Sequence, residues 1–261
     1  MSKIILKNED ELKGMREAGR VAANIRVAVA KAIAPGVTTR ELDLYARDLM
    51  EQMGARSAFL NYPGPRRVPP FPSYTCISVN EEVVHGVAGD RKIQLGDIVS
   101  LDVGVSYKGF IGDNAMTVMV GVTDPAHISL VRATQQALLN AIGKAVAGNR
   151  LSDISHAVES TVTPLGFSVV RDFVGHGVGR KMHEPPQIFN YGPPGKGPLL
   201  REGMTLAIEP MVNLGTHEVK TLADGWTVVT RDGLPSVHVE HTVAVREGRA
   251  EILTLADEEN R

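Results

Sequence analysis

Apolar residues near the amino terminus recur at steps of three and four, from Leu12 to Val29. This spacing predicts an amphipathic helix over residues 10–34 that a Pro-Gly pair brings to an end. Thr38, followed three residues later by a glutamate, forms the pattern of a capping box. We therefore expect a second helix that runs to about Met53 and is stopped by the next residue, a glycine.

Residues 61–73 break this periodicity, because they contain five of the fifteen prolines of the chain. Proline lacks a backbone donor and disfavours both helices and the interior of sheets. The stretch, which includes Arg66, therefore predicts an irregular loop. Its length indicates a functional role rather than a simple connection.

Strand-like alternation follows the loop, and the later chain mixes helices with short strands. Strands are predicted at residues 75–79, 98–107 and 110–120, with Lys108-Gly109 as a hairpin turn between the last two. Asp124-Pro125 begins a helix predicted to reach Ala147, and Ser152 is expected to cap another that ends near Pro164. From Phe167 onward we expect short strands, ending in a pair near residues 236–245 and 251–255.

Both halves of the chain have helices first and then strands that carry acidic residues. This order predicts an α+β fold in which two pseudo-symmetric units pack into a single domain spanning residues 1–261. The hydrophobic content of 43% is sufficient for a sizeable core.

Charge and cysteine content exclude several classes of protein. The 28 Lys+Arg and 30 Asp+Glu nearly balance, so we predict neither nucleic-acid binding nor membrane binding, and contact with a ribosome requires a local patch. The single cysteine, Cys76, excludes an intramolecular disulfide and is typical of a reducing compartment. No stretch has the length of apolar residues needed to cross a bilayer or to form a signal peptide, so we expect a cytoplasmic protein.

Four carboxylates stand within apolar, strand-like surroundings: Asp102, Asp113, Glu209 and Glu240. For any one of them, a salt-bridged or solvent-facing position is the more common explanation. Burial of four ionised groups is costly unless they are paired or hold a metal ion, and few basic residues lie nearby in the sequence. Shared metal ions are therefore the simpler interpretation.

Two histidines accompany the carboxylates, one in Gly-His176-Gly-Val-Gly and one seven positions later, in His183-Glu-Pro-Pro. Standing alone, both would be interpreted as surface-loop histidines. The glycine spacing differs from the dinucleotide-binding fingerprint, and the prolines argue against the helix that fingerprint needs. Four carboxylates with an imidazole suit a pair of divalent ions such as Mn, Fe, Co or Zn, which indicates hydrolysis by an activated water.

Taken together, these motifs resemble those of type I methionine aminopeptidases, a group within the M24 metallopeptidases. The matching segments are Leu-Asp102-Val, Gly-Asp113, Gly-His176-Gly-Val-Gly, Ile-Glu209-Pro-Met and Val-Glu240-His-Thr. A further match, from Cys76 to the histidine nine residues on, precedes them, so the resemblance covers nearly the whole chain. It implies the pita-bread fold and two divalent ions (Co, Mn, Fe, Zn or Ni).

The resemblance also implies a role for each ligand. Asp102 is expected to bind one ion and His176 with Glu209 the other, while Asp113 and Glu240 bridge the two. The activity implied is removal of the initiator methionine from nascent polypeptides with small second residues, by a monomer.

Catalytic and pocket residues follow from the same likeness. Glu209 is expected to shuttle the proton of the attacking water, His85 to contact the substrate near the scissile amide, and His183 to polarise the carbonyl. An apolar pocket for the methionine side chain is expected from Tyr62, Phe71, Cys76 and Trp226, although a lone tryptophan is as often an ordinary half-buried core residue.

Several features refine this expectation. Glu240 follows Glu209 by only 31 positions, too few for the helical insertion of type II enzymes. No further domain is expected before the first helix. The chain departs from the family in a longer proline-rich loop, in Met182 where an aromatic residue is frequent, and in Gly104 where threonine is frequent.

Three alternatives remain from the sequence. A proline-specific peptidase of the same fold shares the five ligands but usually has an additional amino-terminal domain. An inactive binding protein on this fold would normally lose ligands, and this chain keeps all five. An unrelated hydrolase with structural carboxylates is the third.

Overall fold

The structure is a computed structural model that describes residues 3–65 and 67–259, so Arg66 of the predicted loop and the terminal residues 1–2 and 260–261 lie outside the described residues. Its helices are α1 (Glu9–Ala32), α2 (Thr39–Gln52), α3 (Pro125–Ile142) and α4 (Leu151–Val162), followed by a 3-10 turn at Thr163–Leu165. Its strands are β1 (Arg56–Ser57), β2 (Cys76–Val79), β3 (Glu82–Val84), β4 (Ile98–Tyr107), β5 (Phe110–Met119), β6 (Ser168–Val169), β7 (Gly175–Gly177), β8 (Glu184–Ile188), β9 (Thr205–Ile208), β10 (Met211–Asn213), β11 (Val219–Thr221), β12 (Val228–Thr230), β13 (Ser236–His238), β14 (Glu240–Ala244) and β15 (Glu251–Ile252).

The capping box predicted for α2 is confirmed. Thr38 Oγ1 accepts from the backbone N–H of Glu41 at 3.1 Å, and Glu41 Oε2 accepts from the backbone N–H of Thr38 at 2.8 Å. A second capping box, at Asn8 and Glu11, begins α1. These pairs satisfy N–H groups that have no partner within the helix, which is why both helices begin where they do.

Two predicted helix boundaries are wrong. The helix expected to reach Ala147 ends at Ile142, because the chain then turns so that the Ala147 N–H donates to the carbonyl of Arg246. Ser152 does not cap α4: Asp153 accepts from the Arg150 N–H at 2.7 Å, whereas the Ser152 hydroxyl accepts from the backbone of a distant loop. At the end of α3 and at Ser152, a contact with a distant segment takes the place of the local contact that the sequence predicted.

The main sheet is antiparallel and, within the described residues, has nine strands in the order β1-β4-β5-β14-β9-β7-β8, with β2 on β4 and β15 on β14. The predicted hairpin β4–β5 is confirmed: its turn residues Lys108 and Gly109 both have positive φ, 48° and 81°. This turn geometry matches the twist of the flanking strands.

The strand predicted at residues 236–245 is instead two strands. β13 pairs with β10 in a small three-stranded sheet, and β14 pairs with β5 and β9 in the main sheet. The break falls at Val239. One continuous run of alternating apolar residues therefore contributes to two sheets. No local sequence pattern indicates where it divides.

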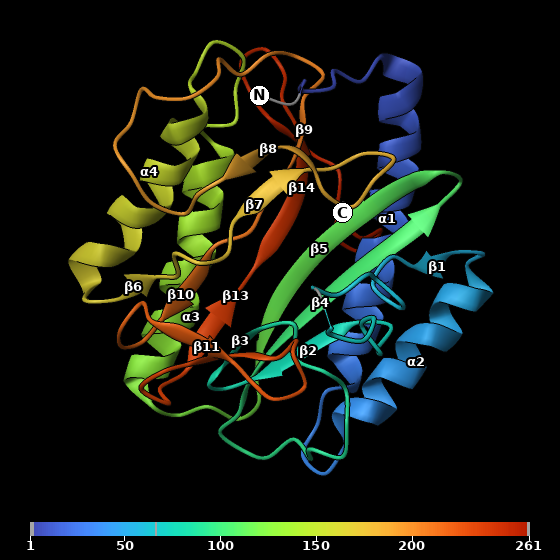
Figure 1. Ribbon diagram of the computed structural model, residues 1–261, viewed down its shortest axis with the longest axis vertical. Coiled ribbons are helices and arrows are strands. Elements are labelled where there is room, and N and C mark those ends of the chain that lie inside the picture. Colours follow the sequence, from blue (N-terminus) through green and yellow to red (C-terminus); the bar gives the residue numbers. More distant parts are fainter. Residues whose placement is uncertain (1–2, 66, 260–261) are drawn as a thin grey trace.

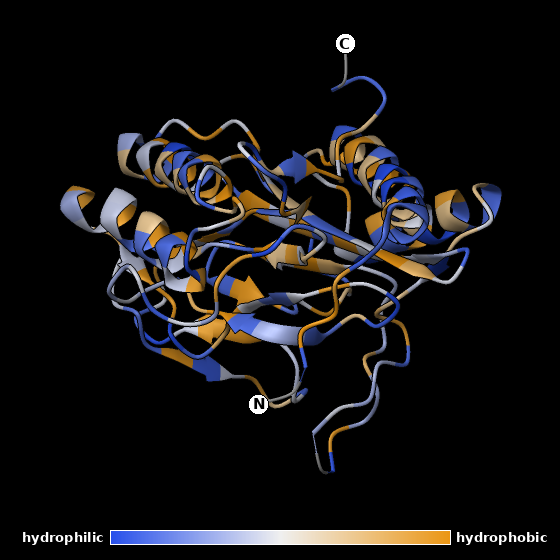
Figure 2. Ribbon diagram, turned by 90° about the horizontal axis from the view of Figure 1, so that it is seen from above, coloured by the Kyte–Doolittle hydropathy of each residue, from blue (hydrophilic) through white to orange (hydrophobic). Residues whose placement is uncertain are grey.

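Both helix pairs lie on the same side of the curved sheet (Figure 2), with α1 and α2 over one half and α3 and α4 over the other (Figure 1). Each pair packs its apolar face against the strands below and encloses its own buried cluster. The expected arrangement of a curved antiparallel sheet flanked by helices in two similar halves is confirmed. Among the described helices, none is long and apolar enough to cross a bilayer.

Candidate active site

A cavity of about 260 Å³ opens on the face of the sheet and is bordered by all eleven residues that the sequence predicted as functional. These residues are Tyr62, Phe71, Cys76, His85, Asp102, Asp113, His176, His183, Glu209, Trp226 and Glu240. They come from segments spread over most of the chain, so the fold brings together what the sequence keeps apart.

Three carboxylates converge because of strand register. On the hairpin, Asp102 pairs with Ala115 and Gly104 pairs with Asp113. Glu240 on β14 pairs with Ala115 from the other side. Since alternate residues of paired strands share one face, all three carboxylates point the same way, around a small alanine. One oxygen from each of the three lies within 4.8 Å of the other two.

His176 extends this group toward Glu209. Its Nε2 atom lies 3.4 Å from Glu209 Oε1 and 3.7 Å from Asp113 Oδ2, so Asp113 belongs to both clusters. The Nδ1 atom is 2.9 Å from the carbonyl of Gly177, which only accepts, so Nδ1 carries the proton. The neutral ring therefore presents the lone pair of Nε2 to the two carboxylates.

Burial shifts the pKa values of these groups in opposite directions. Loss of water raises the pKa of Asp113 to about 7, and burial with mutual repulsion holds those of Asp102, Glu209 and Glu240 well above their usual range. Burial also lowers the pKa of His176 to about 3. Burial therefore disfavours the charged forms of the carboxylates and of the histidine alike, unless a cation binds among them.

Unsatisfied oxygens lead to the same conclusion. One buried carboxylate oxygen of each of Asp102, Asp113 and Glu240 has no hydrogen-bond partner among the described residues. Buried polar atoms without partners are uncommon and require an explanation. Carboxylates and a neutral imidazole that converge on one small space fit divalent cations, whose charge would satisfy these oxygens.

The two further predicted histidines flank the carboxylates. His183 Nδ1 lies 2.6 Å from the hydroxyl of Tyr62, and its ring centre is 4.4 Å from that of His176. His85 packs edge-on against Phe173 and Trp226, with ring centres 5.4 and 6.4 Å away. Burial lowers the pKa of His85 to about 4, so at neutral pH it is uncharged.

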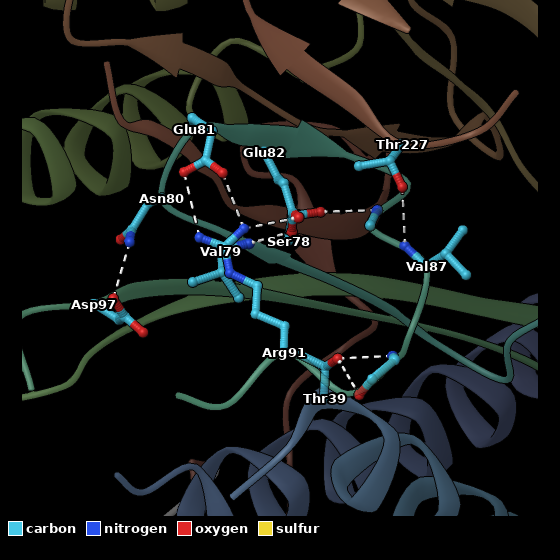
Figure 3. A network of polar contacts seen from close by, with 12 residues as sticks. Thr39, Ser78, Val79, Asn80, Glu81, Glu82, Val87, Arg91, Asp97 and Thr227 are labelled. Carbon is cyan, nitrogen blue, oxygen red and sulfur yellow. Dashed lines mark hydrogen bonds and ion pairs between the residues drawn. The ribbon is translucent and has the colours of Figure 1, made fainter. Parts of the chain in front are cut away.

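A polar network fixes the segment that carries His85 (Figure 3). Backbone N–H groups of the two residues after it donate to the hydroxyls of Ser78 and Thr227. Further along the chain, Arg91 donates hydrogen bonds to Glu81 and Glu82, at 3.0 and 2.9 Å, and so ties the end of the segment to the residues that precede it. His85 itself has φ of 58°, an unusual value that such anchoring maintains.

The apolar side of the cavity is formed mostly by loops. Trp226 packs edge-on against Phe71, with ring centres 5.2 Å apart, and its Nε1–H donates to the carbonyl of Pro69 at 2.9 Å. The predicted proline-rich loop is thereby attached to the cavity. Cys76 is buried here, and burial holds the pKa of its thiol well above the usual range, so it remains protonated.

The lack of a side chain at Gly104 leaves room for two bulky neighbours, and the sequence did not indicate that these two lie together. An added Cβ would lie 2.5 Å from a ring carbon of Phe59 and 2.7 Å from the terminal methyl of Met182. Both side chains therefore occupy the space that a larger residue at position 104 would need. This accounts for the departure at Gly104, whose missing side chain gives room to the cavity wall.

The loop that carries His183 is held by a buried ion pair. Lys7 Nζ lies 2.7 Å from Glu184 Oε2, and each side chain is about 5% exposed. The other oxygen of Glu184 accepts from the backbone N–H groups of Arg180 and Lys181. The segment before α1 thus fastens one edge of the cavity.

Sequence reasoning missed several residues that border the cavity, among them Phe59, Phe173 and Met211. These are ordinary apolar residues with no chemical signal. It also missed the buried His238, for which a signal existed: the residue stands two positions before Glu240 in the same alternation.

Comparison with known proteins agrees with this geometry. The chain matches the metallopeptidase family M24 over residues 13–247. It is 48% identical to the methionine aminopeptidase of Clostridium perfringens (strain 13 / Type A) over 252 residues, 97% of this chain and 99% of that protein. Methionine aminopeptidase 1 of Bacillus subtilis (strain 168) is also 48% identical, over 96% of this chain and 99% of its own length.

Solved structures agree as well. A methionine aminopeptidase from Thermotoga maritima superposes with a TM-score of 0.93 at 46% identity, covering 97% of this chain and all of that one (100%). A prolidase from Pyrococcus horikoshii OT3, 23% identical, matches 64% of its chain with a TM-score of 0.75 and shows the fold alone. The expected pita-bread fold is confirmed, and the chain belongs to metallopeptidase family M24.

Proposed function

We propose that this chain is a methionine aminopeptidase that hydrolytically removes the initiator methionine from polypeptides with small second residues. The observation that carries this proposal is the convergence of a neutral imidazole lone pair, on His176, with buried carboxylates at 3.4 and 3.7 Å. The likeness to methionine aminopeptidases over nearly the full chain supports it.

The metal ligands of the proposal form two overlapping groups. Asp102 would hold one divalent ion, His176 and Glu209 would hold the other, and Asp113 and Glu240 would contribute to both ligand sets. Two divalent ions held here would lower the pKa of a water and polarise the scissile carbonyl. The position of Asp113 in both groups supports its contribution to both ligand sets.

The remaining steps belong to the side chains of this protein. Glu209 accepts a proton from the attacking water and delivers it to the departing amine, a role suited to a carboxylate whose pKa is raised by burial. The Tyr62 hydroxyl donates to His183 Nδ1, which places the proton of the neutral ring on Nε2, ready to donate to the carbonyl oxygen. His85 contacts the substrate near the scissile amide.

The methionine side chain occupies the apolar part of the cavity. Aromatic edges at Tyr62, Phe71 and Trp226, with the protonated thiol of Cys76, provide a polarisable surface for a thioether. The 260 Å³ space is small, which favours one side chain of moderate size over a long peptide segment.

We further propose that residues 1–261 form one catalytic domain that acts as a monomer in the cytoplasm. Its partners are the N-termini of nascent polypeptides, met at the ribosome through transient contact. The contribution of both halves to one cavity supports the single domain. Sedimentation of the purified protein tests the monomer, and co-sedimentation with ribosomes tests the contact.

Peptide hydrolysis tests the central proposal. The protein is first stripped with a chelator, then assayed on Met-Ala-Ser with added Mn²⁺ or Co²⁺, beside an Xaa-Pro peptide. We expect metal-dependent release of methionine and slower cleavage of the Xaa-Pro peptide. Faster Xaa-Pro cleavage identifies a proline-specific peptidase, and no metal-dependent rate identifies an inactive binding protein; either result overturns the proposal.

A further inference from the structure

One buried nitrogen near the cavity has no partner among the described residues. The Nε2 atom of His238 has almost no contact with solvent and makes no hydrogen bond. The residue ends β13, and its side chain is only 4% exposed. A buried histidine nitrogen without a partner is uncommon, and this one is not used by the chemistry proposed above.

The backbone of His238 is held firmly in place. Its N–H donates to the hydroxyl of Ser100 at 3.2 Å, and its carbonyl accepts from the hydroxyl of Thr117 at 2.7 Å. These two hydroxyls contact each other across the β4–β5 hairpin, at 2.8 Å. By strand alternation they lie on the same face as Asp102 and Asp113, so one rigid hairpin positions both the carboxylates and this histidine.

The unpartnered nitrogen faces Glu209. Glu209 Oε2 lies 3.9 Å from His238 Nε2, whereas Glu209 Oε1 lies 3.4 Å from His176 Nε2. Each oxygen of this carboxylate therefore has its own histidine. His176 uses its proton on the backbone and offers a lone pair, so it cannot donate to Glu209. His238 is the neighbour that can.

We propose that His238 is a positioning residue for Glu209: its Nε2–H donates to Oε2 and so directs Oε1 toward the metal position beside His176. This inference rests on the proposed function, because it assigns Glu209 its metal-binding and proton-shuttling roles. The gap of 3.9 Å closes with a small rotation of the carboxylate about its terminal torsion, which is broad for glutamate. A donor to an ionised carboxylate makes a strong, charge-assisted bond.

Three variants test the role by what they place within reach of Glu209. His238→Leu replaces the donor with an apolar side chain. His238→Gln retains an N–H near the same point, whereas the side chain of His238→Asn is too short to bring its N–H to Glu209. The measurements are the affinity of the metal-stripped protein for Mn²⁺ by calorimetry, kcat and KM on Met-Ala-Ser, and the visible absorption of the Co²⁺-loaded protein.

We expect His238→Leu to lower Mn²⁺ affinity and kcat by about 10- to 100-fold, the range for partners that orient metal ligands, with KM little changed. His238→Gln should recover most of this loss and His238→Asn little of it. The number of Co²⁺ ions bound should stay the same in all variants. Wild-type affinity and kcat in His238→Leu overturn the proposal, and so does loss of one Co²⁺ equivalent, which identifies His238 as a direct ligand.

A matched control separates positioning from general damage. His241, also largely buried, bonds Thr254 at 2.9 Å on the other side of β14, so His241→Leu should reduce thermal stability but not Mn²⁺ affinity. If circular dichroism shows that His238→Leu does not fold, the Gln and Asn variants decide the question: equal behaviour of the two overturns the proposal. Calorimetry reports on His238 even if the wild-type protein fails to cleave methionyl peptides, a result that rejects the proposed function alone.

Discussion

Two sides of the same cavity are built in different ways. The floor comprises Asp102, Asp113, His176, Glu209 and Glu240, and most of these residues stand on paired strands of the main sheet. The wall comprises Phe59, Tyr62, Phe71, Met182 and Trp226, and all of these stand in loops. The floor is charged and resists its own burial, whereas the wall is mostly apolar and packs edge to edge.

The difference shows what each side requires. Metal ligands need fixed separations, and strand register supplies these through backbone hydrogen bonds that do not depend on the ligands. An apolar wall needs only shape and contact, which loops adjust through packing. We therefore expect changes in the floor to abolish metal binding, and changes in the wall to alter catalysis or substrate affinity with the metal still bound.

The largest effect is expected from Asp113→Ala. Asp113 belongs to both clusters, so its loss should lower kcat/KM by more than about a hundredfold, beyond the cost typical of an outer partner, and abolish tight binding of the metal pair. Calorimetry with Mn²⁺ and peptide hydrolysis measure this. Asp97→Asn, at the residue just before β4, is the control and should retain activity. Wild-type metal affinity in Asp113→Ala would show that Asp113 is not one of the metal ligands.

Acidification is a second way to weaken metal binding by the floor residues. The pKa of Asp113 is raised from 3.8 to about 7, so below pH 7 this carboxylate holds a proton that a metal ion must displace. Affinity should therefore fall as pH falls below 7, by about tenfold per pH unit for each displaced proton, and proton release should accompany binding. Calorimetry of the metal-stripped protein at pH 5, 6 and 7 checks this. Affinity that is flat over this range contradicts the prediction.

Tyr62→Phe tests a wall residue that touches the chemistry. It removes the hydroxyl 2.6 Å from His183 Nδ1 and leaves the ring in place. One net hydrogen bond contributes about 1 kcal/mol, so we expect kcat to fall by about five- to tenfold with Mn²⁺ affinity unchanged. A fall in metal affinity of the same size would mean that floor and wall are not separable here.

Gly104→Ala sharpens the comparison with the smallest change. The added methyl group must displace Phe59 or Met182 toward the cavity, at a strain of about 1 kcal/mol or more. We expect kcat/KM for methionyl peptides to fall by about fivefold, mainly through KM. The double variant with Phe59→Ala should recover part of this loss, because the contact is then absent. Additive effects in the double variant would contradict the proposed clash.

The sequence alone determined the features that depend on neighbouring residues. The capping box at Thr38 and the turn at Lys108-Gly109 follow from local hydrogen bonds and backbone preferences. The shared face of Asp102 and Asp113 follows as well, since the turn sets the register of the hairpin. Glu209, Glu240, His176 and His183 were indicated by their apolar or glycine-rich surroundings. The resemblance supplied the other site residues, and all of them border the cavity. Their individual roles stay predictions.

Tertiary structure decided what depends on contacts between distant segments. It ended α3 at Ile142, bonded the Ser152 hydroxyl to a distant loop instead of the start of α4, and divided the last long alternation at Val239 between two sheets. It also set His238 beside Glu209, 29 positions away in the chain. Periodicity specifies which face of an element is apolar, but not which other element covers that face, because this choice is made by the packing of the whole chain.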